Sequence, residues 1–147
     1  MPPTRPPTCA DVLVREGFGD PETTPVHTVV LPASAEAPRD ARIFAWGISP
    51  PLDDDDMAVL GLLTSELVTN GVLHARTDLT YGIAVTPDLV LVGVGDGSSA
   101  VPTEPTGSEP TSGRGMHLLV SLAHQWGVHV GDGGKVVWFT IARRRAA

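Results

Sequence analysis

The sequence predicts a single domain of the α+β class. With 147 residues, 41% of them apolar, the chain can form one hydrophobic core, whereas two independent units would each be small. The hydrophobic pattern predicts a strand, two helices, two strands, a helix and two more strands in chain order. The two middle strands and the last two are each separated by a short turn, which is typical of antiparallel hairpins.

Residues 1–25 precede the first predicted strand. They contain proline, threonine and acidic residues without sustained periodicity. Such a composition is typical of a disordered leader, because few of its side chains can be buried. The folded domain is therefore expected to span residues 26–147.

The first half of this domain begins with a valine-rich strand over residues 26–31. Ser34 can cap the helix that follows, and Gly47 ends that helix just after Trp46. A longer helix opens at the four aspartates 53–56, whose charges suit the positive end of the helix dipole. This role is favoured over a calcium loop, because the glycine and the distal glutamate of an EF-hand are absent.

The second half of the domain contains two hairpins and one helix. Strands are predicted over 79–85 and 89–95, and a final hairpin turns near residues 132–134. Residues 97–113 carry almost no core-forming side chain and are too many for an ordinary connection, so this loop is expected to be functional or mobile. A third helix begins at about Arg114.

Charge and cysteine content narrow the classes of function. The net charge is −7 and the only basic cluster is residues 143–145, which argues against a nucleic-acid partner. Cys9 is the single cysteine, so one chain can form neither a disulfide nor a thiolate metal site. The N-terminal prolines replace the apolar run of a signal peptide, and no stretch is expected to reach membrane-spanning length. We therefore expect a soluble cytoplasmic protein without a membrane partner.

Three polar side chains interrupt the apolar sector of the second helix. Glu66, Asn70 and His74 are four residues apart, so they stack on one face aimed toward the core, about 5–6 Å from neighbour to neighbour. Burying a carboxylate there costs on the order of several kcal/mol unless a cation, a ligand or a water molecule satisfies its charge and hydrogen bonds. Buried backbone groups could also satisfy these side chains, and both alternatives stay open. The surrounding sector contains Leu60, Leu63, Leu67, Val59, Leu62 and Leu73.

Residues 66–70 and the pair His74-Ala75 resemble the N-box of GHKL ATPases, especially the bacterial anti-sigma-factor serine kinases and their actinobacterial relatives. The resemblance implies a two-layer α/β sandwich of the Bergerat type, with a mixed, mainly antiparallel sheet and three helices on one face. It also implies ATP and Mg²⁺ as cofactors. Asn70 would coordinate the magnesium ion, and Glu66 would be the catalytic residue that activates a serine hydroxyl. His74 would contact phosphate or pack beside the site.

Asp96 and Gly97 follow a predicted strand and resemble the first glycine box of this family. The resemblance implies that the Asp96 carboxylate accepts a hydrogen bond from the adenine amino group. An Asp-Gly pair at a strand end is also a common turn, so a structural role stays open.

Gly113, Arg114, Gly115 and Met116 stand at the start of the third helix and resemble the second glycine box. Glycines let phosphate approach the backbone, and the free amides of a helix N-terminus favour negative charge. Arg114 would contact phosphate or face solvent, and Met116 would join the core or the adenine pocket wall. The stretch between the two boxes would be the ATP lid.

Residues 134–138 resemble the last strand of the family, with one departure. Relatives often carry a threonine that supports the adenine site, whereas Val136 lacks a hydroxyl. We expect this difference to affect nucleotide affinity or a water-bridged contact and to leave the fold unchanged.

The resemblance implies a serine/threonine kinase that phosphorylates an anti-sigma antagonist protein and controls a sigma factor. Small kinases of this kind tend to form homodimers. A second hypothesis is a nucleotide-dependent binding module that docks to partners without phosphotransfer. A third is a detached histidine-kinase-like catalytic domain, whose phosphoacceptor helices would be supplied in trans.

Overall fold

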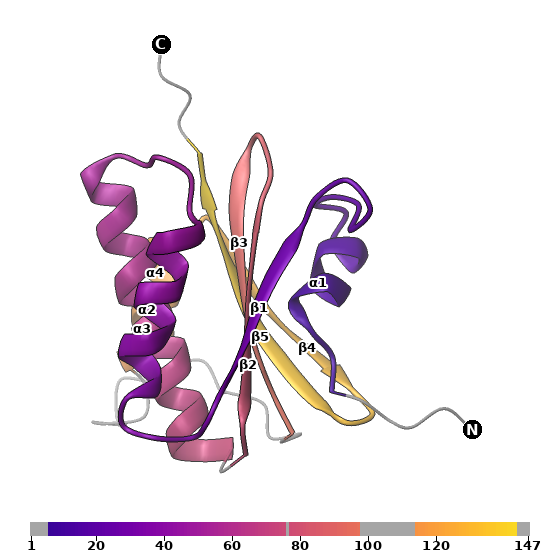
Figure 1. Ribbon diagram of the computed structural model, residues 1–147, viewed down its shortest axis with the longest axis vertical. Helices are drawn as coiled ribbons and strands as arrows, with labels where there is room; N and C mark the ends of the chain where they lie inside the picture. Colours follow the sequence, from indigo (N-terminus) through magenta and orange to yellow (C-terminus); the bar gives the residue numbers. More distant parts are fainter. Residues whose placement is uncertain (1–5, 76, 98–113, 144–147) are drawn as a thin grey trace.

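A computed structural model describes residues 6–75, 77–97 and 114–143, and only the backbone of residues 114–116. Its centre is a five-stranded sheet in which every described neighbouring pair of strands is antiparallel. Figure 1 shows this sheet edge-on, with helices on both sides. The strands, in the spatial order β1-β2-β3-β5-β4, are β1 (Val26–Leu31), β2 (Leu79–Val85), β3 (Leu89–Asp96), β4 (Gln125–Gly131) and β5 (Gly134–Ala142).

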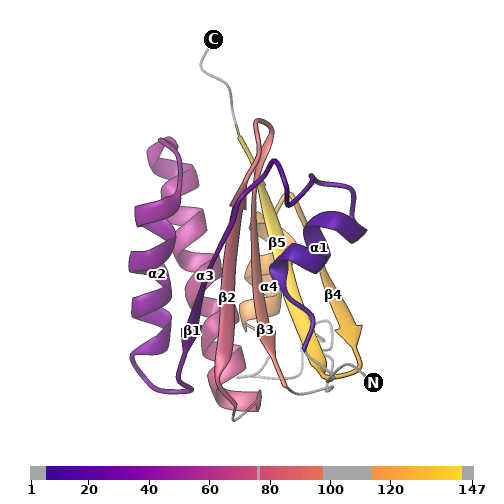
Figure 2. The ribbon, with the colours of Figure 1, turned by 45° about the vertical axis from the view of Figure 1, so that its right-hand side comes forward.

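Four described helices cover the two faces of the sheet. One face carries α2 (Ala37–Ile48), α3 (Asp54–Ala75) and α4 (Arg114–Leu122), and the other carries α1 (Cys9–Arg15) (Figure 2). The three-helix layer and the order of the elements after α1 confirm the predicted α+β sandwich. Two details differ from the prediction. The described strands are all antiparallel, whereas a mixed sheet was expected, and a helix also covers the second face.

Two hydrophobic cores result, one on each face of the sheet. Side chains along a strand alternate between the faces, so β3 and β5 contribute to both cores and are buried almost from end to end. The helix-side core includes Val90, Val92 and Val94 of β3 and Val137, Phe139 and Ile141 of β5. The core on the α1 side consists of Cys9, Val12, Leu13, Ala84, Leu91, Val136 and Trp138.

The prediction of a disordered leader is wrong for residues 6–25. The helix α1 begins after Thr8, whose backbone N–H donates a hydrogen bond to Asp11 Oδ2 at 2.8 Å. Val12 and Leu13 are fully buried. A helix of seven residues is marginal alone, so packing against the sheet stabilises it.

Glycines in the sheet allow α1 to pack closely. A Cβ atom added to Gly82 or Gly93 would lie 2.5 Å or 3.1 Å from the Cβ atom of Cys9. Because such distances are shorter than ordinary contacts, larger side chains at these positions would displace the helix. The glycines of β2 and β3 therefore provide the seat for α1.

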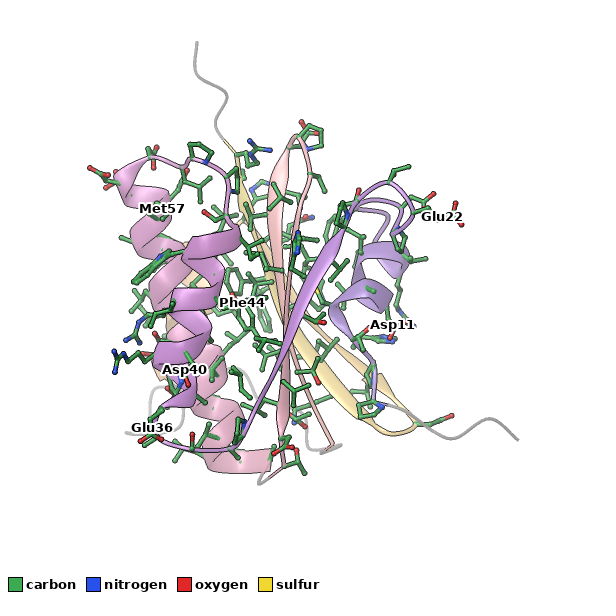
Figure 3. The ribbon with its side chains drawn as sticks, viewed as in Figure 1. Asp11, Glu22, Glu36, Asp40, Phe44 and Met57 are labelled. Atoms are coloured by element: carbon green, nitrogen blue, oxygen red, sulfur yellow. The ribbon has the colours of Figure 1, made fainter. Side chains whose placement is uncertain are left out.

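The helices α2 and α3 pack together where a tryptophan side chain of α2 lies over a glycine of α3. Trp46 of α2 covers Gly61 of α3, where an added Cβ atom would lie 2.5 Å from the ring. Beside it, Arg42 Nη1 donates a hydrogen bond to Ser65 Oγ at 2.6 Å. Phe44 points from α2 toward the sheet (Figure 3), and its ring meets that of Tyr81 edge-on at a centroid distance of 6.0 Å.

The helix α3 opens at the aspartates, as predicted. Asp53 Oδ1 accepts a hydrogen bond from the backbone N–H of Asp56 at 2.7 Å. With 22 residues, α3 is long and apolar enough to cross a membrane by length and composition alone, so the expectation that no stretch reaches this length is wrong. The core helix of a soluble protein passes the same test, and α3 buries one face in the domain.

Candidate functional site

The helix α3 places Glu66 and Asn70 at the edge of its buried face. Leu63 and Leu67 are buried against the sheet, whereas Glu66 and Asn70 are half-buried and His74 is exposed. The prediction that all three polar side chains point into the core is therefore wrong. The reason is that the broad apolar sector includes an uncovered part, where Leu62 is 41% and Leu73 63% exposed.

The flank that carries Glu66 and Asn70 faces away from α2. Ser65 is held by α2, and one residue along a helix turns the side chain by about 100°. Asn70 lies four residues beyond Glu66, on the same side of α3. Among the residues that the structure describes, neither Glu66 nor Asn70 has a hydrogen-bond or ion-pair partner.

Asp96 forms a buried ion pair that the sequence did not predict. Lys135 lies opposite Asp96 in the register of β3 and β5, and its Nζ atom is 3.1 Å from both Oδ1 and Oδ2 of Asp96. Each residue is only 5% exposed. Both side chains are on the helix side of the sheet, because Val94 and Val137, two residues away on each strand, belong to the helix-side core.

The end of β3 is attached to the connection that follows α3. The backbone N–H of Gly97 donates a hydrogen bond to Thr77 Oγ1 at 3.2 Å. The C-terminal end of α3 and the ends of β3 and β5 that carry the ion pair therefore lie at one end of the domain, the lower end in Figure 1. Asp96 thus ends β3 and takes part in a buried ion pair at this end of the domain.

The third predicted box is only partly described. The helix α4 begins at Arg114, so Arg114, Gly115 and Met116 form its first turn, as expected. Their side chains and the whole of Gly113 lie outside the described part of the chain. Leu119, three residues after Met116, is fully buried in the helix-side core.

The expected effect of Val136 on the adenine site needs correction. Val136 is fully buried in the α1-side core, where its Cγ2 atom would lie 3.2 Å from a Cβ atom added to Gly93. A hydroxyl at this position would point away from Asp96. On the strand β5, the residue that faces Asp96 is Lys135.

A magnesium ion would not find a ready cluster of protein ligands here. Within residues 6–75, 77–97 and 114–143, no group of three or more His, Cys, Asp or Glu side chains could hold a metal ion. Because magnesium often takes most of its ligands from phosphate and water, one amide oxygen such as that of Asn70 suits it.

Comparison with known proteins identifies one fold. No family model and no curated protein sequence matches the chain. The crystal structure of the RsbU and RsbW domains of Rv1364c from Mycobacterium tuberculosis is similar, with a TM-score of 0.61 and 21% identity over 83% of this chain. The chain spans 34% of the length of that structure. The likeness shows the fold, which is an α+β sandwich with a five-stranded sheet.

Proposed function

We propose that the chain is a cytoplasmic, magnesium-dependent ATP-binding regulator that transfers the γ-phosphate of ATP to a serine or threonine of a partner protein. One observation carries the proposal. Glu66 and Asn70, one helical turn apart, lie on one flank of α3, half-buried and without a described partner. Half-buried polar groups of this kind keep hydrogen-bonding capacity that a bound nucleotide can use.

The two side chains suit complementary parts of phosphoryl transfer. The amide oxygen of Asn70 would be a neutral ligand for a magnesium ion, which would neutralise charge on the phosphates. The Glu66 carboxylate lies about 6 Å further back along the helix axis, within reach of a hydroxyl directed at the γ-phosphorus. That hydroxyl oxygen forms the new P–O bond, the bond to the bridging oxygen of ADP breaks, and the hydroxyl proton passes to Glu66.

Other parts of the domain fit the remaining parts of the nucleotide. The free amides in the first turn of α4 favour phosphate. Asp96, at the end of β3, offers acceptors for the amino group of adenine. His74 is exposed on the last turn of α3, where it supports the phosphates or faces solvent.

The class of partner is proposed from the resemblance of the boxes and from the fold shared with a protein that has RsbU and RsbW domains. We propose an anti-sigma antagonist as the phosphorylated protein and a sigma factor as the regulated one. Phosphorylation would add about −1.5 to −2 charges to the antagonist, enough to change its docking.

Titration calorimetry with Mg-ATP and Mg-ADP tests the nucleotide site. Asn70→Ala is expected to weaken Mg-ATP binding by about tenfold or more, because one ligand of the bridging metal is lost. Thr69→Ala is the matched control, since Thr69 is half-buried on the same helix but points about 100° away. It should leave the dissociation constant within about twofold of the wild-type value. Absence of Mg-ATP binding to the wild type would overturn the proposal.

Phosphotransfer separates a kinase from a silent binding module. With labelled ATP and candidate antagonists, Glu66→Gln is expected to lower transfer by about 10²-fold or more while nucleotide still binds. If no antagonist is labelled by the wild type, or if Glu66→Gln leaves regulation in cells unchanged, the protein acts by docking alone.

A further inference from the structure

The buried ion pair leaves part of its lysine unsatisfied. A lysine ammonium has three N–H donors, and the two oxygens of Asp96 accept at most two of them at the observed distances of 3.1 Å. Asp96 is the only partner of Lys135 within the described part of the chain. Lys135 is only 5% exposed, so the third N–H belongs to a largely buried side chain, and it lacks a described acceptor.

Such a donor calls for an acceptor from outside the chain. A buried charged donor without an acceptor is costly, and the cost is larger than for a neutral group. The ammonium lies beside the carboxylate that ends β3, on the helix side of the sheet. An acceptor atom next to a group bound by Asp96 would therefore be within reach of Lys135.

We infer that Lys135 and Asp96 together read the edge of a purine base, an inference that rests on the proposed nucleotide site. A carboxylate alone recognises one N–H donor of the base. With a lysine beside the carboxylate, the site also favours a base that has a hydrogen-bond acceptor on the atom next to that N–H donor. Adenine offers this pair, because its 6-amino group donates to Asp96 while its N1 atom accepts from Lys135.

Base recognition by Lys135 is tested by removing one acceptor from the nucleotide. In 1-deaza-ATP a C–H group replaces N1, and the 6-amino group is retained. For the wild type, 1-deaza-ATP is expected to bind at least about tenfold more weakly than ATP, because a charged hydrogen bond is lost. In Lys135→Met the two nucleotides should bind with a ratio near one, because the donor is already absent.

A second variant guards against misfolding. Lys135→Met removes the Lys135 cation from the buried Asp96 carboxylate, which is destabilising. The double variant Asp96→Asn with Lys135→Met removes both charges, and its ratio should also be near one. Cooperative thermal unfolding and binding of ATP itself establish that each variant is folded.

A spectroscopic measurement reports on the contact directly. Lys135 is the only lysine in the sequence, so labelling lysine with ¹⁵N at Nζ gives one ammonium resonance. ATP should shift this resonance, and 1-deaza-ATP should shift it much less. A water molecule that simply satisfied the third N–H would give equal shifts with both nucleotides and would overturn the inference.

The outcomes distinguish this inference from the proposed function. If the wild type does not bind ATP, both fail. If the wild type binds ATP but the ratio of the two dissociation constants is the same with and without Lys135, only the role of Lys135 is overturned.

Discussion

The residue Gly134 connects the hairpin turn to the candidate base site. Its φ angle of 150° lies where side chains are rarely tolerated, and an added Cβ atom would overlap the carbonyl oxygen of Asp96. Gly134→Ala is therefore expected to displace the end of β3 and to lower the free energy of unfolding by about 2 kcal/mol or more. Urea denaturation measures this loss.

Gly47 provides the matched control for this substitution. It lies within α2, and an added Cβ atom would meet no atom within 4 Å. Gly47→Ala is expected to raise the free energy of unfolding by up to about 1 kcal/mol, because alanine favours the helix. A loss of similar size in both variants would contradict the role of close approach at Gly134.

The sequence indicates some of the candidate site residues and not others. Glu66 and Asn70 were identified because the four-residue spacing within one helix is visible in the sequence. Lys135 was missed, because its partner Asp96 is 39 residues away and the register of two strands decides whether they meet. Val136 was expected to affect the adenine site, but it faces the α1-side core, since successive side chains along a strand point to opposite sides of the sheet.

At the scale of an element, the helix α1 was not predicted, because the composition of the whole N-terminal segment concealed its helical pattern. Cys9, Val12 and Leu13 have the three- and four-residue spacing of a helix face, but prolines before them and polar residues after them dominate the segment. Seven residues are too few for a stable isolated helix, so only its contacts with the sheet reveal it. For α3, the prediction that its polar side chains point into the core failed for a different reason. Apolar residues lie on several sides of this helix, so the sequence does not show which side packs against the sheet.

Packing of α1 on the sheet leads to a stability prediction. Leu13 is fully buried, so Leu13→Ala should lower the free energy of unfolding by about 2–5 kcal/mol. Val14, its neighbour on the same helix, is 58% exposed, and Val14→Ala should change stability by less than about 0.5 kcal/mol. Chemical denaturation distinguishes the two variants. Equal small effects would mean that α1 is detached in solution.

At the scale of the whole molecule, local sequence patterns predicted the helices and strands but not which of them lie side by side in space. The order of strands and helices after residue 25 follows from periodicities that each segment carries by itself. The sheet order β1-β2-β3-β5-β4 and the covered second face depend on contacts between distant segments. The strand β2, like β3 and β5, lies between the two cores, with Tyr81 facing one and Ala84 the other.

These two cores each contain a buried acid. Burial raises the pKa of the Cys9 thiol to about 12, although a backbone hydrogen bond involving Gly93 lowers it. Burial also raises the pKa of the Tyr81 hydroxyl, although its 2.9 Å hydrogen bond with Thr64 lowers it. Each group is therefore neutral in the folded protein and ionises more readily after unfolding.

Alkaline pH should therefore destabilise the whole domain. The stability linked to Cys9 is fully present below the unfolded pKa, near 9.0, and is lost as the pH rises toward 12. At about pH 10.5 the thiol alone should lower the free energy of unfolding by about 2 kcal/mol, because each pH unit above the pKa of the unfolded state lowers it by about 1.4 kcal/mol. Cys9→Ser does not titrate there, so its urea midpoint should fall less than that of the wild type between about pH 8 and 10.5 in reducing buffer. Parallel decreases in the two proteins would mean that the thiol already reaches solvent in the native state, and that α1 does not seal the second face of the sheet.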